Sequence, residues 1–297
     1  MIERWDDMPL TYYLVDVFAE AKYQGNQLAV FRNAGSLTSC EMQKIAKEIN
    51  FSETTFIMSE TKINNGYEVK IFTPDVEIPF AGHPTLGTAF ILQQEIKQEP
   101  SPCIILNLGV GQIPVTFTKD QELWMRQNQP TFGPRVNPEI IADILTLNRE
   151  DINPNFPVQE VSTGLPALIV PLKSLAGVRK CQVNHAGFKN FIKQYFSANI
   201  LVFCPETYDQ KNDLHVRVFC DDSGFPEDPA TGSANGCLAG YLLEYNYFEK
   251  KRIQYQVEQG YEIGRPSLLK VKAAQEGNHF DINVGGKVFL VARGIWE

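Results

Sequence analysis

An internal repeat is the sequence feature that most constrains how this chain folds. In residues 38–50, TSCEMQKIAKEIN, the apolar residues at 42, 45, 46 and 49 have the spacing of one buried helix face. Residues 184–196, NHAGFKNFIKQYF, repeat that spacing about 146 positions later. The strand-like stretch YEVKIFTPDVEIP (67–79) is matched in the same way by LHVRVFCDDSGFP (214–226), and both are expected to be half-buried. Matched segments in one order predict a duplicated fold with two similar halves.

Each half is expected to contain two strands, a helix, two strands, a turn and a second helix. Thr38 and Glu41 predict a capping box at the start of the first helix. A stretch rich in Pro, Asn and Gln, residues 126–139, predicts the linker between the halves. The closing segment, residues 287–297, is strand-like and is expected to join the sheet of the first half. The expected domains are an N-terminal half-domain, residues 1–130 plus 287–297, and a C-terminal half-domain, residues 131–286.

The composition limits which partners and cofactors we expect. The 27 Lys and Arg residues against 35 Asp and Glu residues give a net charge of −8, so no nucleic-acid partner is expected. No apolar stretch reaches the length of a membrane span, so no membrane partner is expected either. Six cysteines without a Cys-x-x-Cys pair and four scattered histidines predict no metal site and a cytoplasmic protein with reduced thiols. No dinucleotide or phosphate-loop motif occurs, so no cofactor is expected.

Two glycine-containing stretches, AGHPTLG (81–87) and ATGSANG (230–236), are expected to open the second helix of each half. The first of these helices is predicted to begin at or near Pro84, an accepted first helical position. The other is predicted to have Thr231 or Ser233 as its cap and to bury one apolar face. Helix N-termini carry unpaired N–H groups and attract anions. In a duplicated fold, the two N-termini would meet across a cleft.

Taken singly, the candidate residues of these stretches have ordinary structural explanations. His83 would be a capped surface residue, Asp228 a turn residue and Glu53 a solvated residue of an amphipathic strand. Taken together, four stretches resemble the PhzF-like family, which is named for the isomerase of phenazine biosynthesis. They are DVFAEAKYQGNQLAVF (16–31), NFSETTFI (50–57), IFTPDVEIPFAGHPTLGTA (71–89) and EDPATGSANGCLAGYL (227–242). The resemblance covers nearly the whole chain in order and spacing.

The resemblance implies an α+β fold with two pseudo-symmetric domains. Each domain would be a curved, mostly antiparallel sheet or barrel around a central helix, as in diaminopimelate epimerase and proline racemase. It also implies a cofactor-free isomerase that forms a homodimer and acts on a small carboxylate substrate similar to dihydro-hydroxyanthranilate.

The resemblance also assigns roles to particular residues. Glu53 matches the catalytic acid and base of the family, and His83 and Asp228 match residues that hold the substrate and handle protons. The substrate-binding residues that it implies are Asn26, Gly82, Gly232 and Ser233, with Asn26 having the least defined duty.

The residues at the helix starts exclude one branch of this fold. Two-base racemases have a cysteine at each helix start, whereas this chain has Ala81 at one and Ala230 or Thr231 at the other. Asn199, near the place in the second half that matches Glu53, is not a carboxylate. We therefore expect one base, Glu53, to move a proton along one face of the substrate. Burial in a closed cleft would disfavour the charged form of this carboxyl group.

Three functions remain open from the sequence. An isomerase is the leading interpretation, and a lyase or tautomerase could use the same acid and base on the same scaffold. A non-catalytic protein that binds small acids would keep the cleft without the chemistry. The exact substrate depends on pocket walls that the motifs do not identify.

Overall fold

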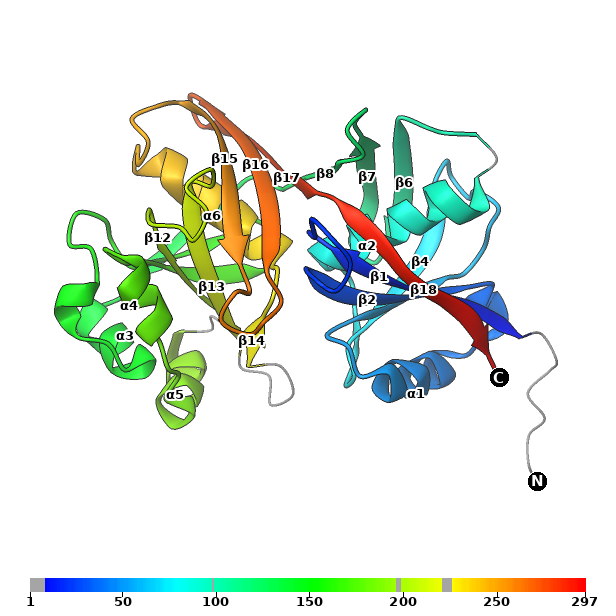
Figure 1. Ribbon diagram of the computed structural model, residues 1–297, viewed down its shortest axis with the longest axis horizontal. Coiled ribbons are helices and arrows are strands. Elements are labelled where there is room, and N and C mark those ends of the chain that lie inside the picture. Colours follow the sequence, from blue (N-terminus) through cyan, green and yellow to red (C-terminus); the bar gives the residue numbers. More distant parts are fainter. Residues whose placement is uncertain (1–8, 98, 196–198, 221–225) are drawn as a thin grey trace.

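Two halves lie side by side in the computed structural model, which describes residues 9–97, 99–195, 199–220 and 226–297 (Figure 1). The elements of the first half are β1 (Leu10–Val17), β2 (Asn26–Arg32), α1 (Ser39–Ile49), β3 (Thr54–Ile57), β4 (Tyr67–Phe72), β5 (Glu77–Ile78), α2 (Gly82–Ile91), β6 (Cys103–Leu108), β7 (Gly111–Phe117) and β8 (Leu123–Arg126). A π-helical turn, Leu92–Ile96, continues α2, and a 3₁₀ turn covers Ala34–Ser36.

The second half is larger because it has two additional helices before its central strands. Its elements are β9 (Thr131–Arg135), α3 (Pro138–Leu145), β10 (Gln159–Ser162), β11 (Pro166–Pro171), α4 (Leu175–Lys180), α5 (His185–Tyr195), β12 (Asn199–Cys204), β13 (Leu214–Cys220), β14 (Glu227–Asp228), α6 (Gly232–Glu244), β15 (Arg252–Gln259), β16 (Ser267–Glu276) and β17 (His279–Gly286). A 3₁₀ turn covers Arg149–Asp151, and β18 (Val288–Trp296) closes the chain. The chain is therefore an α+β protein, as predicted.

The strands of the two halves pair in the same order. In the first half, β1 is antiparallel to β2, β2 is parallel to β3, β3 is antiparallel to β4, β4 is parallel to β6, and β6 is antiparallel to β7. The series β10, β11, β12, β13, β15 and β16 repeats each of these pairings. Helices lie between the parallel partners because a parallel connection needs a crossover. This repeated topology is the structural counterpart of the sequence repeat.

Two strands outside these series, β8 and β18, connect the two halves. Strand β8 pairs with β7 of its own half and with β17 of the second half. Strand β18, which follows β17 directly, is antiparallel to β1 of the first half and crosses that half in Figure 1. We propose the division at residues 130 and 286 on this basis.

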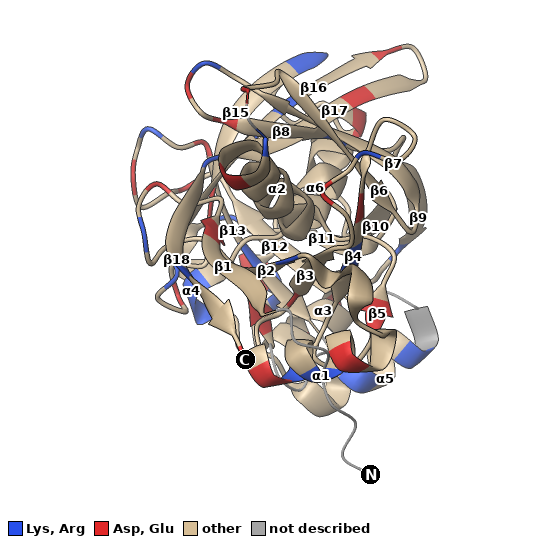
Figure 2. Cartoon of the chain, turned by 90° about the vertical axis from the view of Figure 1, so that its right-hand side faces the viewer, with Lys and Arg blue, Asp and Glu red and all other residues tan. Residues whose placement is uncertain are grey.

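Helices α2 and α6 lie within the curved sheets, near the centre of Figure 2. Every residue of α6 from Gly232 to Leu243 is buried, and in α2 only Phe90 is not. The predicted apolar face of α6 is buried, and the rest of the helix is buried as well, because strands surround it. Small residues permit this close packing. A Cβ on Gly87 would lie only 2.5 Å from Cδ2 of Leu28.

The remaining helices cover the outer faces of the sheets. Helix α1 begins at the predicted capping box, in which Thr38 and Glu41 bond each other's backbone N–H, and it buries Met42 and Ile45. In the second half, the outer core formed with α3, α4 and α5 includes Leu168 of β11. Strand β13 was predicted to be half-buried. It is buried from Leu214 to Phe219 because it has core contacts on both faces.

Two predicted boundaries differ from the structure. Helix α2 begins at Gly82, two residues before Pro84. Part of the predicted linker forms β9. Among the described strands it pairs with β10 alone, so it can accommodate Pro134 as an edge strand. Only residues 127–130 connect β8 to β9.

Candidate active site

The N-termini of α2 and α6 meet between the two halves. A Cβ on Gly82 would lie 3.3 Å from the amide nitrogen of Ser233 and 3.5 Å from Cα of Gly232. A Cβ on Gly232 would lie 3.1 Å from Cζ of Phe18. Glycine at both positions therefore allows the two helix starts to come into contact, as the duplicated fold predicts.

This contact concentrates positive partial charge at one point. The first N–H groups of each helix have no acceptor within the helix, and each N-terminus carries roughly half an elementary positive charge. Two such ends favour a negative group between or beside them. Ala81 and Thr231 occupy the N-cap positions, and neither accepts a capping hydrogen bond through its side chain. Thr231 rather than Ser233 is therefore at the cap, and Ser233 is buried in the first turn.

Asn26 joins the two halves at this point. It is the first residue of β2 and is buried. Its Nδ2 donates to Oδ1 of Asp228 at 2.8 Å and to the carbonyl oxygen of Ala230 at 3.1 Å, and it lies 3.2 Å from Nδ1 of His83. One side chain of the first half is thus bonded to the segment that leads into α6.

Glu53 and His83 face each other beside Asn26. Glu53 directly precedes β3, which runs parallel to β2, so Glu53 and Asn26 lie at the same edge of the sheet. Its Oε2 is 3.5 Å from Nε2 of His83. The side chain of His83 is 6% exposed and that of Glu53 is 18% exposed, so the carboxyl group is the more accessible of the two.

His83 is a neutral imidazole. Burial lowers the pKa of His83 to about 3, and a hydrogen bond with the backbone of Gln27 opposes this shift only in part. A neutral ring has one N–H and one lone pair, so it can donate through one nitrogen and accept through the other. His83 can therefore pass or orient a proton for Glu53 without becoming charged.

Asp228 ends β14 on the opposite side of Asn26. Burial raises the pKa of Asp228, while hydrogen bonds from the Thr231 hydroxyl and the Asn26 amide act in the opposite direction. This places a second carboxyl group, from the other half, in the same cluster as His83 and Glu53. The structure thus brings together all seven residues implied by the resemblance: Asn26, Glu53, Gly82, His83, Asp228, Gly232 and Ser233.

The sequence analysis missed two residues that support this cluster. Gln259 is fully buried, donates to the backbone carbonyl of Asp228 at 2.8 Å and accepts from the amide of Thr231 at 3.2 Å. Arg265 donates to Oδ1 of Asp16 at 2.7 Å and to the carbonyl of Gly25, next to Asn26, at 3.0 Å. No local motif marks either residue, because their partners are far away in the chain.

The strand pairing also identifies which residues of the two halves correspond. Ile57 of β3 pairs with Val69 of β4, and Phe203 of β12 pairs with Val216 of β13, so Ile57 and Phe203 occupy equivalent positions. Counting back the same number of residues from each shows that Glu53 corresponds to Asn199. The second half therefore has an amide where the first has its carboxylate. Cys237 lies inside α6 with its Sγ 3.6 Å from Oγ1 of Thr163, so it is not at the helix start.

Within the described parts of the chain, no group of three or more His, Cys, Asp and Glu residues could hold a metal ion. None of the described helices combines the length and apolar character needed to cross a bilayer.

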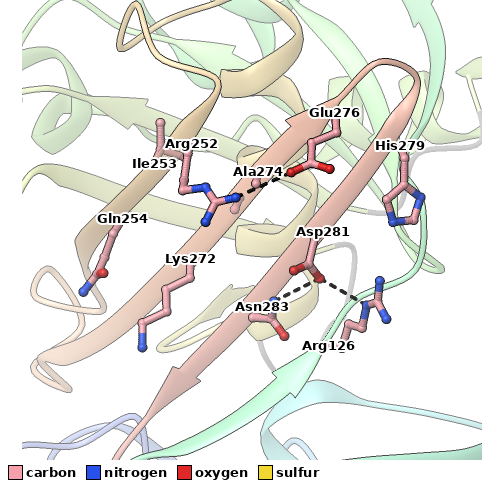
Figure 3. Close-up of a pocket in the computed structure, with 11 residues that line it drawn as sticks. Arg126, Arg252, Ile253, Gln254, Lys272, Ala274, Glu276, His279, Asp281 and Asn283 are labelled. Carbon is pink, nitrogen blue, oxygen red and sulfur yellow. Dashed lines mark hydrogen bonds and ion pairs between the residues drawn. The ribbon is translucent and has the colours of Figure 1, made fainter.

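A separate hollow lies on the outer face of β15, β16 and β17 (Figure 3). Besides Lys272, its charged side chains are paired with each other, Arg126 with Asp281 at 3.2 Å and Arg252 with Glu276 at 3.5 Å. All four are more than half exposed, where such pairs contribute little free energy. This hollow has none of the convergent groups found where α2 and α6 meet.

Comparison with known proteins gives one consistent family. A family model described as phenazine biosynthesis-like protein, PhzC-PhzF, matches residues 15–294. An uncharacterised isomerase of Pasteurella multocida is 35% identical over 294 residues, which span 96% of this chain and 93% of that protein. The trans-2,3-dihydro-3-hydroxyanthranilate isomerase of Pseudomonas chlororaphis is 30% identical over 289 residues, covering 95% of this chain and 98% of that protein.

Solved structures agree with this assignment. A phenazine biosynthesis protein of the PhzF family from Bacillus anthracis has a TM-score of 0.89 and 27% identity, covering 98% of this chain and all of that one. A hydroxyproline epimerase from Agrobacterium vitis has a TM-score of 0.63 at 9% identity, a likeness of fold alone. The predicted fold, shared by PhzF-like proteins and the racemase and epimerase group, is confirmed.

Proposed function

Because this chain belongs to the PhzC-PhzF family of phenazine biosynthesis-like proteins, we propose that it is an isomerase that moves a proton on a small carboxylate substrate. The reaction uses acid and base catalysis in the cleft between the halves and needs no cofactor. The named relative with 30% identity isomerises trans-2,3-dihydro-3-hydroxyanthranilate. A cyclic acid of that kind is the substrate class that we propose here.

One observation carries the proposal. Glu53 and His83 of the first half and Asp228 of the second lie around a single amide, Asn26, beside the contact of the two helix N-termini. A carboxyl group, a neutral imidazole and an anion-binding backbone are the parts that proton abstraction next to a carboxylate requires. Asn199 in place of a second carboxylate favours one base over two.

In the proposed reaction, the substrate carboxylate binds the N–H groups at Gly82, Gly232 and Ser233. Glu53 removes a proton from a substrate carbon, the double bonds shift, and the same carboxyl group returns the proton to another carbon. Negative charge that develops on the substrate is stabilised by the helix N-termini, which need no reorganisation. His83 keeps the proton of Glu53 in position, and Asp228 and Asn26 hold the amine or hydroxyl groups.

The family resemblance also supports two further proposals about the molecule as a whole. We propose that the protein acts in the cytoplasm and that it forms a homodimer.

The role of Glu53 can be tested with Glu53→Gln. This change keeps the size of the side chain and removes its proton transfer. We expect exchange of carbon-bound hydrogen of trans-2,3-dihydro-3-hydroxyanthranilate with D₂O to fall by roughly 10²–10⁴-fold. Binding of the stable aromatic analogue 3-hydroxyanthranilate should be retained. Glu48→Gln, on the exposed face of α1, is the matched control and should leave exchange unchanged.

The products separate this proposal from its competitors. Exchange that persists in Glu53→Gln would remove Glu53 from the role of base. Loss of a substituent from the product would indicate a lyase, and tight binding by the wild type without any exchange would indicate a binding protein.

A further inference from the structure

Three positions beside the start of α6 are polar, whereas the equivalent positions beside the start of α2 are apolar. The pairings of β13 with β14 and of β4 with β5 give the first equivalent pair, and the N-cap positions of the two helices give the second. The pairings of β13 with β15 and of β4 with β6 give the third. The three pairs are Asp228 and Ile78, Thr231 and Ala81, and Gln259 and Leu108.

The first half therefore shows that the repeated fold does not need polar side chains at these positions. It forms the same strand pairings and the same helix start with isoleucine, alanine and leucine. Burying polar groups costs free energy unless each of them is hydrogen-bonded. The polar set of the second half is thus a feature that folding alone does not require.

The amide of Gln259 has one possible orientation. Its Oε1 accepts from the backbone N–H of Thr231 at 3.2 Å and from Nδ2 of Asn235 at 3.0 Å. Its Nε2 donates to the carbonyl oxygen of Asp228 at 2.8 Å and to Oγ1 of Thr231 at 3.0 Å. A backbone N–H can only donate and a carbonyl oxygen can only accept, so these two partners fix which end of the amide is which.

This orientation directs the hydroxyl hydrogen of Thr231 toward Asp228. Because Oγ1 of Thr231 accepts from Gln259, its own hydrogen needs another acceptor, and the one within reach among the described residues is Oδ2 of Asp228. The other oxygen, Oδ1, accepts from Nδ2 of Asn26 at 2.8 Å. Both oxygens of Asp228 therefore face donors, and a proton on either oxygen would point at one of them.

We propose that Thr231, oriented by Gln259, is a positioning residue that keeps Asp228 ionised at neutral pH, so that Asp228 serves the reaction as a hydrogen-bond acceptor. The inference rests on the proposed function for the use that is made of Asp228. An ionised Asp228 suits the amine or hydroxyl hydrogens of the substrate, and the transferred proton is left to Glu53. Two carboxyl groups in one cleft thus have different duties because their surroundings differ.

The surroundings of Asp228 make its hydrogen bonds decisive for its charge. Burial and the neighbouring charge of Glu227 raise the pKa of Asp228, whereas the bonds from Thr231 and Asn26 lower it. Loss of the Thr231 bond should therefore raise this pKa further. The titratable and charged groups that face Asp228 are Glu227 of β14, Arg217 of β13, which pairs with Glu227 at 2.7 Å, His83 of α2, which meets the same Asn26 amide, and Glu53 beside His83.

Thr231→Val tests the hydroxyl group, because valine keeps the branched shape without the donor. Thr231 accepts no capping hydrogen bond, so this change removes no cap from α6. The carboxyl carbon of Asp228 can be titrated by NMR in protein made with ¹³C-labelled aspartate, and Asp228→Asn identifies its signal. We expect the titration midpoint to rise by about one to two pH units, the value of one hydrogen bond to a charged group.

Two further variants show whether this rise comes from the hydroxyl group. Thr231→Ser keeps the donor and should restore the wild-type midpoint. Thr61→Val, at an exposed position after β3, is the matched control and should leave the midpoint unchanged. An unchanged midpoint in Thr231→Val, or a raised one in Thr231→Ser, would overturn the proposal.

Gln259→Leu tests the orienting step, because it installs the residue that the first half has at this position. The Asp228 midpoint should rise by less than in Thr231→Val, since the hydroxyl group remains but is no longer held. If Gln259 acts through Thr231, the double variant should have the same midpoint as Thr231→Val alone. An additive rise would show that Gln259 acts on Asp228 without Thr231 and would overturn its orienting role.

The pH dependence of substrate hydrogen exchange separates a positioning role from a structural one. In Thr231→Val, the acid side of the exchange profile should move to higher pH by the same amount as the Asp228 midpoint, because exchange requires the ionised form. An equal fall in rate at every pH would indicate a structural role and overturn the proposal. If the wild type exchanges no hydrogen while the Asp228 midpoint moves as expected, the isomerase proposal fails and the control of the Asp228 charge by Thr231 stands.

Discussion

The position of one proton decides how Glu53 and His83 work together. The amide of Asn26 has two hydrogens and three acceptors near its nitrogen, and the two oxygens are closer than Nδ1 of His83. If both hydrogens go to oxygens, Nδ1 keeps its own proton for the Gln27 backbone, and Nε2 presents a lone pair to Glu53. An attractive contact then requires the proton on Glu53. If Asn26 instead donates to Nδ1, the proton is on Nε2 and Glu53 is ionised. The pair is therefore neutral with two protons in the first arrangement, and it carries one proton and one negative charge in the second.

The neutrality of His83 should be visible in the pH dependence of stability. The pKa of His83 is about 3 in the folded protein and about 6.5 in an unfolded chain. The unfolded state therefore binds the proton first, so the contribution of His83 is complete above about pH 6.5 and is lost as the pH falls toward 3. Between pH 7.5 and 5 the wild type should lose about 2 kcal/mol that His83→Asn does not lose. Urea unfolding at both pH values measures this difference. If His83→Asn loses as much stability as the wild type between pH 7.5 and 5, His83 is charged or exposed in the folded protein.

At the scale of elements, the turn after β15 connects the two sides of the site. Gln259 bonds the backbone of Asp228, and Arg265 bonds Asp16 and the backbone of Gly25. The turn itself is fixed by His215, whose Nε2 lies 3.1 Å from Glu262. Although burial opposes it, contact with Glu258 and Glu262 raises the pKa of His215. One short turn therefore holds both Asp228 and the loop that leads to Asn26.

Arg265 is a positioning residue in this account, and Arg265→Ala should show it. The loss of its bonds leaves Asp16 buried without its cation and should destabilise the protein by about 1–3 kcal/mol. The variant should also displace Asn26 and so lower the rate of substrate hydrogen exchange by about 10–100-fold, because moving a positioning group by about 1 Å lowers the rate by that order. We expect kcat to fall more than the affinity for 3-hydroxyanthranilate.

Arg252→Ala is the control for this experiment, because Arg252 forms an ion pair that is about four-fifths exposed. It should change neither stability nor exchange measurably. If Arg265→Ala has a normal exchange rate per folded molecule, Arg265 stabilises the fold but does not position Asn26 for the reaction.

The elements that the sequence predicted best are those whose signals are local. The capping box of Thr38 and Glu41 fixes the start of α1, and the repeated helix spacing predicts α5. Segments whose structure depends on distant partners were assigned less well. Residues 131–135 resemble a linker and become a strand only because β10 lies beside them. Helix α2 begins at Gly82 because the two helix starts pack together, a contact that the Pro84 rule does not include.

At the scale of the whole molecule, the repeat predicted the meeting of the two helix starts but not the difference between the halves. The motifs identify Glu53, His83 and Asp228 because these residues lie in short, distinctive stretches. Gln259 and Arg265 lie in stretches without such features, and only the folded chain shows what they contact. The sequence therefore predicts the residues of the cluster, whereas the residues that hold the cluster in place are found only in the folded chain.

We expect the crossing of β8 and β18 between the halves to make the two halves unfold as one cooperative unit. Met125 of β8 pairs with Val115 of the first half and with Val284 of the second, and each of the three is almost fully buried. Unfolding either half would remove strand partners from the other. Leu168→Ala should therefore lower the stability of both halves, although Leu168 lies in the outer core of the second half.

The expected loss for Leu168→Ala is about 2–5 kcal/mol, the cost of deleting a buried leucine side chain. Hydrogen exchange under native conditions can measure it separately in β12 and in β2, because global opening exposes both strands. We expect equal losses of protection in the two strands, and no measurable loss in Ile140→Ala, where the side chain is on the exposed part of α3. If β2 keeps its full protection while β12 loses its own, the halves open independently. The contact of α2 with α6 would then be an interface between two separate domains, and the cleft between them would open without unfolding either one.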